Sequence, residues 1–578
     1  MSLPRGWIVL SALLLLWALA VLVTGGIFLE WHGWRISSRE PLRPFVAGVI
    51  VMAIAAWRRG ADGFRTDLSA IAFDAERWGL PCAIALSIVT LFVGLFWGTG
   101  VAGGADSYGY VSQARLWSEG NLIVQQPIAA RVTWPNPNDT LTPLGYKPAT
   151  SNHAIVPTYA PGLPMLMALF SQVHPAGVFS VVPLAGAGLV ALSFLLGRRL
   201  AGAAAGLLTA ALMATSPAFL FQLVAPMSDV VIAAFWIAAL VLALPNQQNR
   251  WLAAGLASSF AILVRPNTAP LAAVFVVAAL WSDQRNARSY RERVLNAAAY
   301  VTGTVPGVLS VAAIHTALYG SPLQSGYGSA ADIYALANVL PNLQRYPFWF
   351  LRSETSIVLL AAAAPLVMAR TPELRWPLMF TTAVAIVTWL CYLAYRPFEE
   401  WWYLRFLLTS FPPLLALTAV ALVAAGRLLT AAWQPPLAVA VVILLAIWRI
   451  DYAKAHGTFD AWRMERRYVE TGSYVADRLP KNAVLYSMQQ SGSLRYYAGR
   501  LTVRWDVLDA GWLDRSIEAL KALGYEPYLV LEDPEEGEFR GRFGRQSQLG
   551  RLNWAPIATL ATQPVVRIYA LSHDAVPR

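Results

Sequence analysis

Apolar runs of about the length of a membrane helix recur through the first 450 residues and then stop. A helix needs about 20 mostly apolar residues to cross a bilayer core. About thirteen runs approach that length, three of them short. They lie near residues 8–29, 44–57, 78–98, 177–197, 202–222, 230–245, 251–264, 268–281, 295–315, 355–369, 376–394, 407–425 and 435–450. This pattern predicts a multi-pass α-helical membrane protein and excludes a wholly soluble one.

The distribution of charge divides the chain into two parts. Charged residues make up 13% of the sequence, about half the share found in soluble domains. The deficit lies in residues 1–450, whereas residues 451–578 have an ordinary soluble density of charge. We therefore expect a transmembrane body over 1–450, followed by a soluble domain over 451–578.

Basic residues beside the apolar runs set the expected orientation. Three clusters, Arg58–Arg77, Arg198–Arg199 and Arg285–Arg293, share one side if about thirteen spans follow a cytoplasmic N-terminus. Basic loops stay on the cytoplasmic side, which places loops 99–176 and 316–354 and the C-terminal domain in the periplasm of a bacterial inner membrane. The net charge of +11 then reflects orientation and lipid contact. The sequence contains no basic stripe with interleaved aromatic residues, so it does not predict a nucleic-acid partner.

The C-terminal domain has the pattern of an α/β unit. An amphipathic helix is predicted over 459–479 and a second near 512–523, and apolar strands are predicted at Ala483–Met488 and Pro527–Glu532. We expect the acidic run Glu532–Glu538 to be a solvated loop.

An aspartate follows the third apolar run, close to the expected outer membrane surface. The run ends in Gly98-Thr99-Gly100, and Asp106 and Tyr110 open a stretch with helical spacing. A carboxylate at this place has a structural explanation, because it caps a helix and complements its dipole. It is equally placed to act as a catalytic base, and both explanations stay open.

The same outer loop contains Lys147, His153 and Tyr159. Lys147 is the only lysine in the first 450 residues, and an ammonium beside a carboxylate, a histidine and tyrosines suggests an anion site. The alternative is compositional, because an arginine-rich chain has few lysines and one must fall somewhere. Since His153, His174 and His315 lack the spacing of metal ligands, we expect no required metal.

Several short motifs along the membrane body together resemble a known superfamily. They are Asp106 with Tyr110 four residues later, Tyr159–Pro164, Met227–Val230, Val264–Asn267, Tyr319–Gly328 and Trp402–Leu408. Their order and spacing resemble the GT-C superfamily, whose members are integral membrane glycosyltransferases that take sugars from polyprenyl phosphates. Within it, the chain resembles the branch of protein O-mannosyltransferases and lipid A aminoarabinose transferases.

The resemblance implies an inverting hexosyl or pentosyl transferase that needs no cofactor and passes the sugar of a polyprenyl-phosphate donor to a cell-envelope acceptor. Asp106 is then the base. The residues expected to bind substrate are Tyr110, Lys147, His153, Tyr159, Asp229, Arg265, Tyr403 and Arg405. Arginine, lysine and tyrosine stabilise a departing lipid phosphate. The alternatives are snorkelling at helix ends for Arg265 and Arg405, and an interfacial aromatic belt for Trp401, Trp402 and Tyr403.

At two positions this sequence differs from the motifs of the family that it resembles. Many relatives carry two consecutive acids where this chain has Asp106-Ser107, and the aminoarabinose transferases have Glu-Lys where it has Thr158-Tyr159. The first leaves a second catalytic carboxylate unassigned, and the second argues against aminoarabinose as the sugar. A transporter or flippase and a catalytically inactive assembly partner remain alternatives. Repeated halves and polar residues inside broken midplane helices, which are typical of transporters, are not found in the sequence.

Two further expectations concern the outer regions. The long loop Tyr319–Glu354 is expected either to close over the donor lipid or to pack statically on the C-terminal domain. Residues 451–578 are expected to be an accessory domain, because they lack a complete phosphate-loop motif. The aromatic cluster around Arg495–Tyr497, Trp505 and Trp512 forms either an acceptor-guiding surface or the core of the domain.

Overall fold

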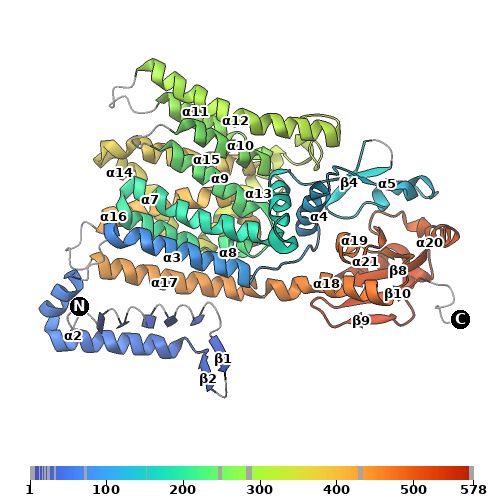
Figure 1. The fold of residues 1–578 in the computed structure, drawn as a ribbon, viewed down its shortest axis with the longest axis horizontal. Coiled ribbons are helices and arrows are strands. Elements are labelled where there is room, and N and C mark those ends of the chain that lie inside the picture. The colour runs from blue at the N-terminus through green and yellow to red at the C-terminus, as the bar shows by residue number, and fades with distance from the viewer. Residues whose placement is uncertain are drawn as a thin grey trace.

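The computed structural model describes residues 27–31, 34–70, 75–150, 153–244, 250–281, 289–426 and 434–571, together with parts of 7–22. Figure 1 shows a bundle of long helices and, at one end of it, a smaller unit built around a sheet. The chain passes from the bundle to this unit through α17 (Gln434–Ala455) and α18 (Ala461–Arg478).

The bundle contains most of the helices. Their bounds are α3 (Ala75–Phe96), α7 (Val181–Ala214), α8 (Pro217–Leu223), α9 (Ser228–Ala243), α10 (Trp251–Val264), α11 (Leu271–Trp281), α12 (Tyr290–Tyr319), α13 (Val339–Glu354), α14 (Ala364–Arg370), α15 (Arg375–Leu393), α16 (Phe411–Gly426) and α17. Helix α2 (Leu42–Ala70) lies apart from the bundle, near β1 and β2, in Figure 1. Short 3₁₀ helices connect several of them, including Pro266–Thr268, Ser356–Ala363 and Trp401–Ser410.

Within the described part of the chain, five helices are long and apolar enough to cross a membrane alone. The number is seven if two strongly bent pairs each form one span: α8 with α9, bent by 115°, and residues 336–354 with 356–370, bent by 107°. The chain is therefore a multi-pass helical protein, and the larger count of about thirteen spans stays a prediction. The first predicted span, 8–29, lies partly outside the described residues, and its last three residues belong to strand β1 (Ile27–Trp31).

Helix α7 is in fact two antiparallel helices. The helical dihedrals break at Ala201 and at Gly202, whose φ is +85°. A Cβ atom on Gly206 would lie 2.6 Å from the carbonyl oxygen of Phe194, so the two halves pack backbone against backbone. Small residues permit such close approach between membrane helices. This turn corresponds to the boundary between the predicted runs 177–197 and 202–222.

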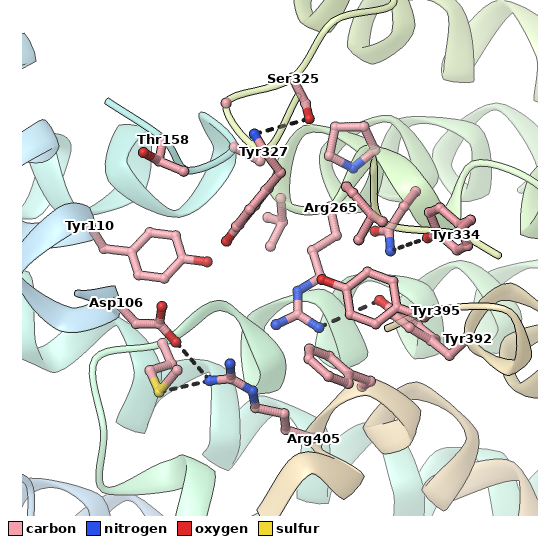
Figure 2. A pocket seen from close by; sticks show the side chains of 18 of the residues that line it. Asp106, Tyr110, Thr158, Arg265, Ser325, Tyr327, Tyr334, Tyr392, Tyr395 and Arg405 are labelled. Carbon is pink, nitrogen blue, oxygen red and sulfur yellow. Dashed lines mark hydrogen bonds and ion pairs between the residues drawn. The ribbon is translucent and has the colours of Figure 1, made fainter. Parts of the chain in front are cut away.

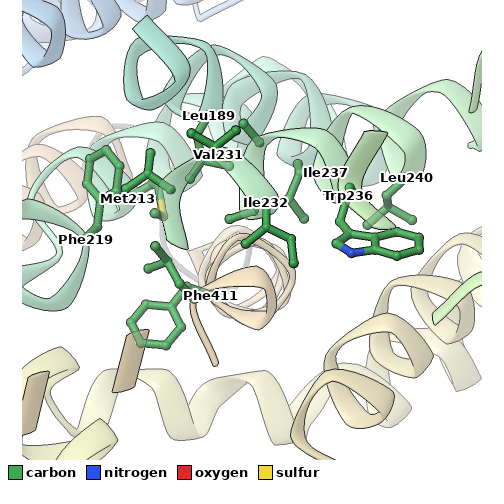
Figure 3. Packing of buried hydrophobic residues seen from close by; sticks show 14 of the residues in the cluster. Leu189, Met213, Phe219, Val231, Ile232, Trp236, Ile237, Leu240 and Phe411 are labelled. Carbon is green, nitrogen blue, oxygen red and sulfur yellow. The ribbon is translucent and has the colours of Figure 1, made fainter. Parts of the chain in front are cut away.

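Helix α9 lies at the centre of the bundle. Val231 and Trp236 on this helix are fully buried, and they belong to one core cluster with Leu189 of α7 and Phe411 of α16 (Figure 3). A helix that is apolar on all sides is stable only when it is enclosed by others. The packing of α9 therefore fixes the residues at its N-terminal end, including Asp229.

The outer region between α3 and α7 is folded and not an open loop. It contains α4 (Asp106–Ser118), β3 (Val124–Gln125), α5 (Pro137–Thr140), β4 (Tyr146–Pro148), β5 (Ala154–Pro157) and α6 (Gly162–Ser171). The strands form a three-stranded antiparallel sheet in the order β3-β5-β4. This region lies at the same end of the bundle as the C-terminal unit, above that unit in Figure 1.

The C-terminal unit is a mixed sheet with helices. Its elements are α18, β6 (Ala483–Tyr486), α19 (Ser491–Ala498), β7 (Leu501–Val503), α20 (Leu513–Ala522), β8 (Glu526–Glu532), α21 (Asp533–Phe543), β9 (Ala558–Leu560) and β10 (Val566–Ala570). The strand order is β7-β6-β8-β10-β9, with β6 parallel to β7 and β8 and with β10 antiparallel to both of its neighbours. The helices and strands predicted in this part of the sequence lie within two residues or so of these elements.

One prediction for this unit is wrong. The acidic run Glu532–Glu538 is not a solvated loop, because α21 begins at Asp533. Glu532 and Glu535 form a capping box at its start and are both buried. Glu532 also pairs with Arg467 of α18 at 2.9 Å. The pattern of charged residues within the segment does not predict this distant partner.

Candidate active site

A cavity of about 330 Å³ lies where the outer region meets the helix bundle. Figure 2 shows that its polar side chains converge from several segments that are far apart in the sequence. Five of the residues singled out in the sequence line it: Asp106, Tyr110, Arg265, Tyr403 and Arg405.

Asp106 is the only carboxylate among the residues that line this cavity. It is the first residue of α4, and its two oxygens accept hydrogen bonds from the Tyr159 hydroxyl at 2.6 Å and from Arg405 Nη1 at 2.9 Å. Helix α4 has no side-chain cap, so capping does not explain the carboxylate. Burial raises the pKa of Asp106, but the charge of Arg405 and these hydrogen bonds outweigh burial, and the pKa lies below its ordinary value.

A second ion pair holds Arg265 beside the cavity. Its Nη2 lies 2.6 Å from Oδ1 of Asp229, which is fully buried at the start of α9. Arg265 Nε also donates to Ser228 Oγ at 3.1 Å. The Arg265 side chain is only 14% exposed and turns inward, so snorkelling does not describe it. Asp229 does not line the cavity, and its role there is to orient Arg265.

Tyrosine hydroxyls supply most of the remaining polar surface. Tyr110 donates to Ser228 Oγ at 2.9 Å, and burial raises the pKa of Tyr110 to about 12, which keeps its hydroxyl protonated. Tyr327, Tyr392 and Tyr395 also line the cavity (Figure 2). Protonated hydroxyls both donate and accept hydrogen bonds, as the hydroxyl groups of a sugar require.

The cavity thus combines one ionised carboxylate with two guanidinium groups. A carboxylate accepts a proton from a hydroxyl group, and guanidinium groups bind and stabilise phosphate oxygens. This arrangement suits a reaction in which a hydroxyl is deprotonated and a phosphate leaves.

Comparisons with known proteins agree with this architecture. Residues 152–311 match the family model described as dolichyl-phosphate-mannose-protein mannosyltransferase. The fold is similar to ArnT from Cupriavidus metallidurans, with a TM-score of 0.51 and 14% identity in the apo state, over 86% of this chain and 98% of that chain. The structure of ArnT bound to undecaprenyl phosphate matches with a TM-score of 0.50 and 13% identity over the same shares.

The family match over residues 152–311 and the fold similarity to ArnT agree with the GT-C resemblance of the sequence motifs. A weaker structural similarity, with a TM-score of 0.48 and 12% identity over 86% of this chain and 75% of the other, is to the oligosaccharyltransferase of Archaeoglobus fulgidus. No curated protein sequence matches.

Besides Asp229, three residues expected in the site do not line the cavity. Lys147 on β4 places its Nζ 5.2 Å from the centre of the Tyr319 ring, and His153 is exposed with its Nδ1 3.2 Å from Asn138 Oδ1. Tyr159 lies immediately behind Asp106 and orients its carboxylate. The expected binding roles of Lys147 and His153 stay predictions.

Trp401 is buried inside the protein and does not belong to an interfacial belt. Trp401 is 3% exposed and contacts Phe221, Tyr452 and His456 edge to face. Tyr403 stacks on Phe398 at 4.0 Å and lies over the guanidinium of Arg405. This packing holds Arg405 at the cavity.

The loop after α12 forms one wall of the cavity. Ser325, Gly326, Tyr327 and Tyr334 belong to it. The backbone at Gly326 lies against Thr158, and a Cβ atom there would be 1.9 Å from the Thr158 carbonyl oxygen. The loop therefore lines the cavity, and its closure over the donor lipid stays a prediction.

The sequence did not identify several lining tyrosines. Tyr327 falls within a motif that carries the GT-C resemblance, so its position was recoverable. Tyr392 and Tyr395 end an apolar run without any distinguishing pattern, so only the fold reveals them. Among the described residues, no three histidine, cysteine, aspartate or glutamate side chains converge as metal ligands.

Proposed function

We propose that this protein transfers a monosaccharide from a polyprenyl-phosphate donor to a hydroxyl group of a cell-envelope glycan, lipid or protein on the outer side of the membrane. The observation that carries the proposal is the Asp106–Arg405 pair, with a distance of 2.9 Å, in a cavity that also contains Arg265. The bound undecaprenyl phosphate in the similar ArnT structure supports a polyprenyl phosphate as the carrier.

In the proposed reaction, an acceptor hydroxyl attacks the anomeric carbon of the donor sugar. Its proton passes to the Asp106 carboxylate, and the bond between the anomeric carbon and the phosphate oxygen breaks. The lipid phosphate leaves with the electron pair of that bond. Arg265 and Arg405 stabilise the charge that develops on the phosphate oxygens.

A single displacement inverts the anomeric configuration. Double displacement needs a second carboxylate as nucleophile about 5 Å from the first. Asp106 is the only acid among the residues that line the cavity, and Asp229 is held by Arg265 behind its wall. These observations favour an inverting transferase.

We assign residues 1–450 to the transferase body and 451–578 to an extracytoplasmic domain, in a bacterial inner membrane with a cytoplasmic N-terminus. The basic clusters near Arg58–Arg77 and Arg285–Arg293 support this orientation. Labelling of single cysteines introduced at Ser107 and at Arg198 in intact cells tests it, since the first is expected outside and the second inside.

The activity is tested with purified protein in lipid nanodiscs. Undecaprenyl phosphates carrying labelled neutral hexoses or pentoses are offered together with cell-envelope extract. We expect label to enter an acceptor while undecaprenyl phosphate is released, and the product to have the opposite anomeric configuration to the donor. Movement of uncleaved donor across a liposome membrane, without transfer, would instead identify a flippase.

A further inference from the structure

The segment that carries Asp106 has little conformational preference of its own. Between α3 and α4 the chain contains Gly98, Gly100, Gly103 and Gly104, and the φ angles of Gly100 and Gly104 are +58° and +57°. Glycine loses more backbone entropy on folding than any other residue. Contacts from elsewhere in the molecule must therefore fix this segment.

Those contacts come from the C-terminal unit. The backbone N–H of Ala102 donates to the Tyr497 hydroxyl at 2.8 Å. The backbone of Gly103 lies on the ring of Tyr468, where an added Cβ atom would be 2.2 Å from a ring carbon. The segment thus rests on α18 and α19, about 365 to 395 residues later in the chain.

A buried polar network supports this contact from behind. Gln489 Nε2 donates to the Tyr468 hydroxyl at 3.0 Å, and the Gln489 backbone N–H donates to Glu535 at 2.8 Å. Arg467 donates to the Tyr468 hydroxyl at 2.7 Å and to Glu532 at 2.9 Å. A network whose members are mutually hydrogen-bonded is rigid, so the position of the Tyr468 ring is well defined.

Helix α19 also packs directly on α4. An added Cβ atom on Gly492 would lie 2.2 Å from the ring of Tyr108, two residues beyond Asp106. Ser491 Oγ accepts the backbone N–H of Leu144 at 3.1 Å. Both sides of Asp106, the glycine segment before it and the first turn of α4 after it, are therefore in contact with the C-terminal unit.

We propose that the C-terminal unit is a positioning element of the active site, which holds the Asp106 carboxylate against Arg405 through its contacts at Tyr497 and Tyr468. None of the residues lining the cavity belongs to 451–578, so the unit acts through the Asp106 segment and not on the substrate. The inference rests on the proposed role of Asp106 as base. It makes the unit more than the accessory domain expected from the sequence.

Two variants of the full-length protein loosen this contact from opposite sides. Tyr497→Phe removes the acceptor of the buried Ala102 N–H, and Gly103→Ala inserts a methyl group against the Tyr468 ring. The control is Tyr528→Phe, which removes the same atom from a hydroxyl that bonds only Glu526 at the exposed surface. All three are compared by hydrogen exchange of peptides that cover residues 98–110.

Loss of a partner for one buried donor changes a local opening equilibrium by about tenfold or more. We therefore expect exchange in residues 98–110 to accelerate about tenfold in Tyr497→Phe and Gly103→Ala and to stay at the wild-type rate in Tyr528→Phe. Unchanged exchange in both of the first two variants would overturn the proposal. This readout does not require any enzymatic activity.

The second readout is transfer, with the donor identified by the assay of the proposed function. We expect kcat to fall about 10- to 100-fold because the base is misplaced, KM for the donor to stay unchanged, and the acid limb of the rate profile to move to higher pH. A purely structural role would lower the yield or melting temperature but leave kcat and the pH profile as in wild type. If exchange changes as expected and the wild-type protein transfers no sugar, the proposed function fails while the positioning contact stands.

Discussion

Arg405 is expected to set the pH dependence of the reaction. The ion pair with Asp106 has an N–O distance of 2.9 Å, with 16% of the Arg405 side chain and 33% of the Asp106 side chain exposed. Two unit charges at about 4 Å interact by about 4 kcal/mol at an effective dielectric of 20. Because the carboxylate is one-third exposed, solvent screens the pair and about 1–3 kcal/mol is the better expectation.

Arg405→Leu removes this positive charge. Burial then raises the pKa of Asp106, and the hydrogen bond from Tyr159 is the main interaction left that lowers it. Since one pKa unit corresponds to about 1.4 kcal/mol, the acid limb of kcat/KM should move to higher pH by about 1–2 units. The acid limb moves upward because, in the wild type, the lowered pKa keeps Asp106 ionised and able to act as a base well below neutral pH.

The assay is transfer from the labelled donor between pH 4 and pH 9, with the same buffers and ionic strength throughout. Arg405→Lys is the matched control, because it keeps the positive charge and loses only the forked geometry. Its acid limb should stay near that of wild type, although its rate is lower. An acid limb that is identical in wild type and Arg405→Leu would refute the assignment of Asp106 as the titrating base.

Three other variants test separate parts of the account. Glu354→Leu leaves Arg449 buried without its partner and should destabilise the protein by about 3–5 kcal/mol, and removal of both charges together should restore most of that loss in a thermal melt. Gly326→Ala should displace the cavity loop and abolish transfer, whereas Gly188→Ala, with open space around it, should not. Burial raises the pKa of Glu535 from its ordinary value of 4.5 to about 7, so this group should cost the wild type about 3 kcal/mol of stability as pH rises from 4.5 to about 7. Glu535→Gln should flatten that dependence in melts at pH 5 and pH 8.

The helices and strands of the C-terminal unit were predictable where the periodicity of their apolar residues is visible within one segment. The helix at Ala461–Arg478 and the strand at Glu526–Glu532 were recognisable because their periodicity is contained within each segment. The helix that begins at Asp533 was missed, because its acidic residues suggested solvent exposure. Only Glu532 and Glu535 of this acidic run are buried, and Glu532 pairs with Arg467, 65 residues earlier in the chain.

The site was predictable where its residues lie in motifs with a recognisable order. Asp106, Arg265 and Arg405 come together as the superfamily resemblance implies. The rarity of lysine in the first 450 residues does not show where the side chain of Lys147 points, and this side chain does not line the cavity. The sequence also gave no indication that Tyr497 contacts Ala102, because residues so distant in the chain meet only through the fold.

The central claim is that Asp106 is the base of a sugar transfer from a polyprenyl phosphate. The most direct test compares wild type and Asp106→Asn in nanodiscs, with undecaprenyl phosphate binding and transfer of labelled sugar measured on the same preparations. The amide keeps the size and the hydrogen-bonding oxygen of the side chain but cannot take the proton. We expect binding within about twofold of wild type and transfer reduced by about 10²- to 10⁴-fold. Transfer at the wild-type rate by folded Asp106→Asn protein would contradict the account.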